Sequence, residues 1–183
     1  TVNSSTQLTV NVSIGDTAAT GLRNITIQIT GDSGSVTANN AFTVNPKPVV
    51  SSTSPSNRGQ GATSQVVDVL GNHFVNGAAV TFPGTGITVN STTFVSATLL
   101  RANITIGTTA TTGSLTVTVT NPDTGTTTAS VYTVNAGPRV DSVTPSSRLQ
   151  GSAAALVTID GANFVSGATL SLGAGVNVSS LTV

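Results

Sequence analysis

The chain carries one stretch twice, as Pro48-Val-Val-Ser-Ser-Thr-Ser-Pro55 and as Pro138-Arg-Val-Asp-Ser-Val-Thr-Pro145. A second matched pair follows, Gly71-Asn-His-Phe-Val-Asn-Gly-Ala78 and Gly161-Ala-Asn-Phe-Val-Ser-Gly-Ala168. Matched positions lie 90 residues apart, a spacing longer than a solenoid repeat and equal to a small domain. The sequence therefore predicts tandem copies of one domain.

Apolar and polar residues alternate in short runs, and this period of two indicates strands with one dry and one wet face. Turn residues separate the runs, and no window has a helical period. The matched runs are residues 8–14 and 100–106, 25–29 and 115–119, 42–44 and 132–134, 67–69 and 157–159, and 80–82 and 170–172. About seven strands per copy predict an all-β fold of tandem immunoglobulin-like antiparallel β-sandwiches.

The dry positions of the middle copy form its predicted core. They are Val67, Val69, Phe74, Val80, Phe82, Leu100, Ile104, Ile106, Leu115, Val117, Val119, Tyr132 and Val134.

Residue 1 does not coincide with the start of a repeat. Thr182-Val183 and Thr1-Val2 occupy the same position of the repeated pattern, in the middle of a domain. We therefore expect a complete domain at residues 47–136, the second half of a domain at 1–46 and the first half of another at 137–183. A half sandwich leaves one apolar face open and buries too little surface to be stable alone. Each half is expected to need a mate, from the same polypeptide or from a neighbouring copy in a head-to-tail array.

Composition excludes several function classes. Only 7% of the residues are charged and the formal net charge is zero, against roughly 25% charged residues in an ordinary domain. One Lys and five scattered Arg do not make the basic patch that nucleic acid requires. No run approaches eighteen apolar residues, so we expect no membrane insertion. Cysteine is absent, which removes disulfides and thiol chemistry.

The residue types that carry catalysis are sparse and scattered. The only histidine is His73, whose repeat equivalent is Asn163, so we interpret it as a turn residue. The six aspartates, Asp16, Asp32, Asp68, Asp123, Asp141 and Asp160, lack the spacing of a calcium loop. The glycines of 31–34 and 84–86 do not match a phosphate-binding loop. We expect no catalytic residue, cofactor or metal.

Two polar features have competing interpretations. Thr-x-Thr tracts such as 116–120 could form an ice- or glycan-binding array, but the wet face of a strand is the simpler interpretation. Six sequons are candidate N-glycosylation sites, at Asn3, Asn11, Asn24, Asn90, Asn103 and Asn177. Asn11 and Asn103 are equivalent positions on the polar face of one predicted strand. Glycans there would supply the hydrophilic coat that charges do not.

The repeated motifs resemble the IPT/TIG family, immunoglobulin-like sandwiches of bacterial surface proteins, some receptors and certain transcription factors. The family opening is matched by Pro138, Val140, Val143, Pro145, Gly151, Gly161 and Phe164, and by Pro48, Val50, Pro55, Gly61, Gly71 and Phe74. Thr53 replaces an apolar residue of the family pattern. Residues 117–121 and Tyr132 are similar to the family's later strands. In bacterial and archaeal surface proteins, such domains serve as tandem spacers or assembly modules.

These observations favour a non-enzymatic extracellular structural protein that builds a cell-surface fibre, stalk or filament by head-to-tail assembly. Its partner would be a second copy of itself, with glycans as an additional candidate. Prolines in the linkers 45–48 and 135–138 would stiffen the joints. The alternative is an adhesin or carbohydrate-binding module, which ordinarily needs exposed aromatic rings. The chain has five Phe, one Tyr and no Trp, most of them at predicted core positions.

Overall fold

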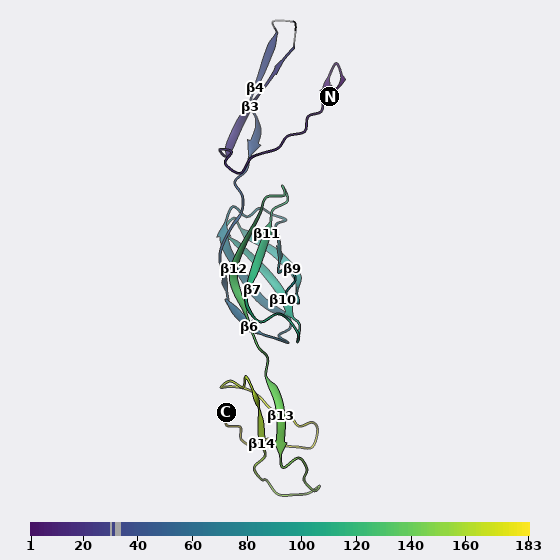
Figure 1. Ribbon diagram of the computed structural model, residues 1–183, viewed down its shortest axis with the longest axis vertical. Helices are drawn as coiled ribbons and strands as arrows, with labels where there is room; N and C mark the ends of the chain where they lie inside the picture. Colours follow the sequence, from purple (N-terminus) through teal and green to yellow (C-terminus); the bar gives the residue numbers. More distant parts are fainter. Residues whose placement is uncertain (30, 32–33) are drawn as a thin grey trace.

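The computed structural model describes residues 1–29, 31 and 34–183, and among these residues it contains strands, turns and loops but no helix. This confirms the predicted all-β class. Three parts follow one another along the longest axis, and the two termini lie towards opposite ends (Figure 1). We call them the N-terminal part (1–46), the central part (47–136) and the C-terminal part (137–183).

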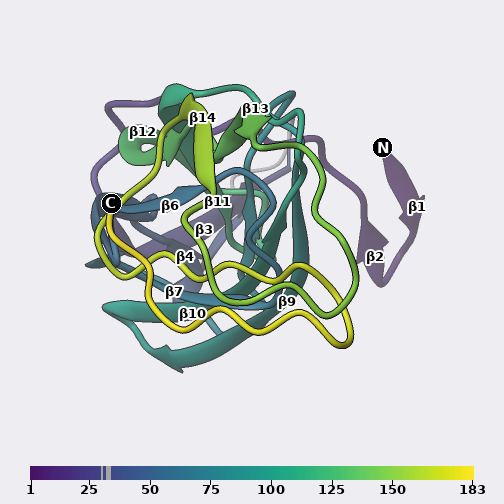
Figure 2. The same ribbon diagram turned by 90° about the horizontal axis from the view of Figure 1, so that it is seen from below.

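The central part consists of two four-stranded sheets. Sheet one has the order β5 (Val49–Ser54), β7 (Gln65–Asn72), β10 (Leu99–Ile106), β9 (Ile87–Ser96), and all its pairs are antiparallel. Sheet two has the order β6 (Asn57–Gly59), β12 (Thr126–Asn135), β11 (Gly113–Thr120), β8 (Ala79–Thr81). In sheet two, β6 runs parallel to β12 and the other pairs are antiparallel. Seen end-on, β7 and β10 lie opposite β11 and β12 (Figure 2).

The core lies between these sheets, where the inward positions of both meet. All thirteen predicted core residues are buried, none more than 6% exposed. The prediction succeeds because side chains alternate strictly between the two faces of a strand. Phe82 and Tyr132 pack edge to face at the centre, with ring centroids 5.4 Å apart.

Two features of the repeated stretch now have physical explanations. Thr53 is buried, and its hydroxyl donates a 2.6 Å hydrogen bond to the Val131 carbonyl, which joins sheet one to sheet two. Gly71 lies where a Cβ would come within 1.8 Å of the Val49 oxygen and 2.6 Å of Phe74 Cζ. Gly161 has the same surroundings in the C-terminal part. Both copies therefore need glycine at this position.

Among the residues that the structure describes, the terminal parts contain only two-stranded sheets. The N-terminal part has β1 (Val2–Ser4) paired with β2 (Gln7–Leu8), and β3 (Gly21–Gln28) paired with β4 (Ser35–Val44). The C-terminal part has β13 (Arg139–Thr144) paired with β14 (Thr158–Ala162). Neither part contributes to the buried cluster of the central part.

Three strand predictions need correction. Within the described chain, residues 9–14 and 170–172 form no strand, although their alternation matches that of β10 and β8. In the central part, β10 pairs with β7 and β9, and β8 pairs with β11. The terminal part that contains residues 9–14 or 170–172 does not contain the segments that match these partner strands. The matching of 25–29 with 115–119 is wrong by two residues, because Ile25 pairs with Ala38 as Val117 pairs with Ala129. The inward face is unchanged by that shift, since two residues are one full period.

Candidate functional site

The apolar side chains of the β3–β4 hairpin and of the segment that precedes it are largely exposed. They are Leu8, Val10, Val12, Ile14, Ile25, Ile27, Ile29, Val36 and Phe42, which are between 39% and 72% exposed. Counted from Gly21 and Gly113, Ile25 and Ile27 correspond to Val117 and Val119, which are fully buried in the central part. We call this set the N-terminal face. At the tip of the β3–β4 hairpin it forms an apolar hollow of about 260 Å³.

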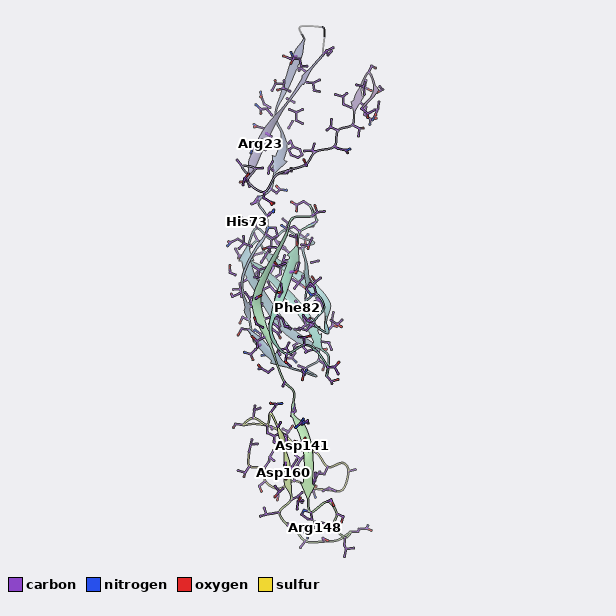
Figure 3. The ribbon with its side chains drawn as sticks, in the orientation of Figure 1. Arg23, His73, Phe82, Asp141, Arg148 and Asp160 are labelled. Atoms are coloured by element: carbon purple, nitrogen blue, oxygen red, sulfur yellow. The ribbon has the colours of Figure 1, made fainter. Side chains whose placement is uncertain are left out.

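A charged residue, Arg23, borders this face. Arg23 occupies the position of the buried Leu115. Its guanidinium donates to the carbonyl of Ala19 in the preceding loop, so the charge lies at the margin of the face. Figure 3 shows Arg23 at the end of the β3–β4 hairpin that is nearer the central part.

The C-terminal part has a second open apolar face. It comprises Val140, Val157, Ile159, Phe164, Leu172, Val176 and Val178, of which Ile159 and Phe164 are partly buried and the others are 37–58% exposed. We call this set the C-terminal face. The matched residues Val67, Val69, Phe74 and Phe82 are at most 4% exposed in the central part.

The amount of unburied apolar surface is large for so small a structure. Complete burial of one such side chain contributes about 1.5–3 kcal/mol, so a half-exposed one forgoes about 1 kcal/mol. Seven to nine such side chains on each face therefore forgo on the order of 10 kcal/mol per face. This is similar to the stability of a whole domain. Large exposed apolar patches generally mark interaction surfaces.

The N-terminal joint is held by hydrogen bonds and an ion pair. Asn45 Nδ2 donates to Asp123 Oδ2 at 3.0 Å, and the Lys47 ammonium pairs with Asp16. His73 lies in the loop after β7 with a left-handed backbone, and its Nδ1 is 3.1 Å from the Lys47 carbonyl oxygen. Figure 3 shows His73 at the end of the central part that faces this joint.

The C-terminal joint uses equivalent positions. Asn163, the match of His73, also has a left-handed backbone and donates to the Gly137 carbonyl at 2.9 Å. The Gly137 amide donates to Gln60 Oε1 at 3.1 Å, beside an open cleft of about 610 Å³. His73 and Asn163 therefore share one structural role, in agreement with the interpretation of His73 as a turn residue.

Two of the six sequon asparagines lie side by side. Asn90 on β9 donates from Nδ2 to Asn103 Oδ1 on β10 at 2.7 Å, and to Thr105 Oγ1 at 3.0 Å. Asn24 accepts the Asn40 amide at 2.9 Å. Asn3 is exposed on β1, and Asn11 and Asn177 are exposed outside strands. The predicted strand position of Asn11 is thus wrong, whereas that of Asn103 is confirmed; glycosylation at any sequon stays a prediction.

The aspartates that the structure describes do not converge. Asp68 on β7 receives two hydrogen bonds from Arg101 on β10, at 2.7 and 3.0 Å, on the outer face of sheet one. Chiefly through these bonds, Arg101 lowers the pKa of Asp68 below its ordinary value. Asp32 lies outside the described residues. Among the residues that the structure describes, no three His or acidic side chains are grouped as metal ligands. Nor does that portion of the chain include a helix long and apolar enough to cross a bilayer.

Sequence reasoning missed the burial of Asn121. Asn121 is 2% exposed; its Nδ2 donates to the His73 carbonyl at 2.8 Å and its Oδ1 accepts the Val75 amide at 3.3 Å. The Tyr132 hydroxyl is buried with no hydrogen-bond partner in the described structure, and burial raises the pKa of Tyr132. An asparagine before a Pro-Asp turn signals only the turn, so nothing local indicated the contact of Asn121 with the loop after β7. No family model matches the chain, and no curated protein matches it.

Proposed function

We propose that this chain is a non-enzymatic structural protein of the cell exterior, built from tandem immunoglobulin-like sandwiches of the IPT/TIG type. It would form a surface fibre, stalk or filament by head-to-tail assembly. The observation that carries the proposal is the two-sheet sandwich of the central part, whose sequence pattern recurs on either side of it.

The topology of the central part supports the immunoglobulin-like assignment. Lettered in chain order, with β6 as an accessory to the first strand, sheet one reads A-B-E-D and sheet two reads G-F-C. This is the arrangement of a constant-type immunoglobulin sandwich. The sandwich supports a mechanical role, because its strands run roughly along the long axis from one joint to the other (Figure 1).

Head-to-tail assembly, as proposed, would join unlike surfaces. The N-terminal face and the C-terminal face lie at opposite ends of the molecule and are different surfaces (Figure 1). Contact between unlike faces is heterologous and extends without closing when the rotation does not form a ring. Few charged residues are available to keep the surface of the protein hydrated. Glycans at the six sequons would make that surface hydrophilic, which supports a location outside the cell.

The adhesin alternative has weaker support. Carbohydrate sites ordinarily use exposed aromatic rings, and Phe74, Phe82 and Tyr132 are all within the core of the central part. Phe42 is 39% exposed, but it belongs to the N-terminal face.

The test is electron microscopy together with sedimentation velocity on the 183-residue polypeptide. We expect filaments that shorten on dilution. Ile27→Asp places a charge on the N-terminal face and should abolish them, whereas the matched control Thr26→Asp on the wet face should retain them. A parent chain that remains an 18.0 kDa monomer at high concentration would contradict the proposal.

A further inference from the structure

We propose that Asn76 is a site of spontaneous covalent modification, where the side-chain amide is lost as ammonia and an aspartyl or isoaspartyl residue remains. The site lies in the turn between β7 and β8. Both strands belong to the central sandwich, so the modification is independent of the proposed head-to-tail assembly.

The sequence singles out this asparagine, because Asn76 is the only one in the chain that a glycine follows. Asparagine is a thermolabile residue, and the group that attacks its side chain is the backbone nitrogen of the next residue. A Cβ on that next residue would hinder the attack. Gly77 has no Cβ, and its peptide rotates with little steric restriction.

The structure leaves both reacting groups accessible. Asn76 and Gly77 are exposed at the tip of a turn, which the Ala78 amide closes by donating to the Val75 carbonyl at 2.9 Å. Gly77 has a φ of 89°, as the third residue of a type II turn requires. Among the hydrogen bonds of the described residues, none ties the Asn76 side chain or the Gly77 amide to another residue. Neither group therefore has to break such a bond before it reacts.

The reaction needs only water besides the two residues. The Gly77 nitrogen loses its proton to the solvent and attacks Asn76 Cγ, so that a new N–C bond forms. The Cγ–Nδ2 bond breaks, and the departing nitrogen takes up a proton and leaves as ammonia. Water then opens the five-membered imide at either of its carbonyls, which gives aspartate or isoaspartate at position 76. Because the amide must first be deprotonated, the rate should rise with pH.

The second copy of this turn shows that the fold does not need the asparagine side chain. Ser166 and Gly167 form the same turn, in which the Ala168 amide donates to the Val165 carbonyl at 3.0 Å and Gly167 has a φ of 83°. Asn76→Ser therefore removes the reacting amide and should keep the turn, which makes it a matched control.

The two products should affect the central sandwich differently. Aspartate keeps the backbone and adds one negative charge to a chain whose formal net charge is zero. Isoaspartate adds the same charge and also lengthens the backbone of the turn by one methylene, about 1.5 Å. The turn has little room for it, because a Cβ on Gly77 would lie 3.2 Å from Pro122 Cγ and the Val75 amide donates to the buried Asn121 side chain at 3.3 Å. We expect isoaspartate to weaken these contacts.

The test is prolonged incubation of the folded chain at mildly alkaline pH, with a parallel sample unfolded in urea. Isoelectric focusing and peptide mass spectrometry follow the conversion. We expect a species of lower isoelectric point, changed at Asn76, to form in the folded chain within about tenfold of the rate in urea, because an exposed turn opens easily. The Asn76→Ser control should not form it. A folded chain that converts more slowly than this, or that converts first at another asparagine, would overturn the proposal.

Discussion

The same substitution at two matched positions should destabilise the monomer by very different amounts. Val117 is fully buried, whereas its structural equivalent Ile25 is 44% exposed. Val117→Asp forgoes about 2 kcal/mol of apolar burial. In addition, the buried carboxyl must either stay charged without a partner or take up a proton at pH 7. Raising its pKa by about three units costs about 4 kcal/mol. The sum, about 6 kcal/mol, is within the range of a whole domain's stability.

Ile25→Asp should destabilise the monomer by only about 1 kcal/mol, because half of the side chain is already in water and the carboxylate remains hydrated. The assay is thermal unfolding followed by circular dichroism, at a concentration where the chain is monomeric. We expect the main transition to be lost in Val117→Asp and to shift by a few degrees at most in Ile25→Asp. Thr116→Asp, on the exposed face of β11, controls for added charge. Equal melting of Val117→Asp and the parent would refute the assignment of strand faces.

Three further predictions concern the central sandwich. Tyr132→Phe should raise the stability of the central sandwich by about 1 kcal/mol, because it removes an unpartnered hydroxyl. Burial raises the pKa of Tyr132, so the parent should also lose stability above pH 10.0, and the variant should not. Urea titrations over this pH range measure both effects. Arg101 lowers the pKa of Asp68, so this pair stabilises the fold above pH 3.8 and the effect is lost as the pH falls below it; the urea midpoints of Asp68→Asn and the parent should differ at pH 6 and converge at pH 2. Gly71→Ala, with its Cβ 1.8 Å from the Val49 oxygen, should cost about 3 kcal/mol or more by calorimetry, whereas Gly84→Ala, which meets open space, should cost less despite its left-handed backbone.

Much of the central sandwich was predictable because one physical rule governs it. Alternation assigns each side chain to a face, and the thirteen predicted core residues are all buried. The polar members of the interior were not predictable in this way. Thr53 and Asn121 are buried because each finds a hydrogen-bond partner on a distant segment, and alternation contains no information about such partners.

Alternation also does not say whether a strand has a neighbour. Residues 8–14 have the same pattern as β10, yet only Leu8 is in a strand, since β10 is held on both sides by β7 and β9. Alternation likewise does not predict the contact between Asn90 and Asn103. That contact depends on a β-bulge, because Asn103 lies opposite Ser91 and Ile104 lies opposite Val89. The division of the chain into one complete domain and two half domains stays a prediction, made from the phase of the repeat.

Head-to-tail assembly, as proposed, joins the N-terminal face of one copy to the C-terminal face of another, and mixing two complementary variants tests this pairing. Ile27→Asp disables the N-terminal face and leaves the C-terminal face intact, while Val157→Asp does the reverse. Each variant alone should be a monomer, and sedimentation equilibrium of an equimolar mixture should give a dimer of twice 18.0 kDa and nothing larger. A mixture that remains monomeric, while the wet-face controls Thr26→Asp and Thr158→Asp polymerise, would contradict the pairing of unlike faces.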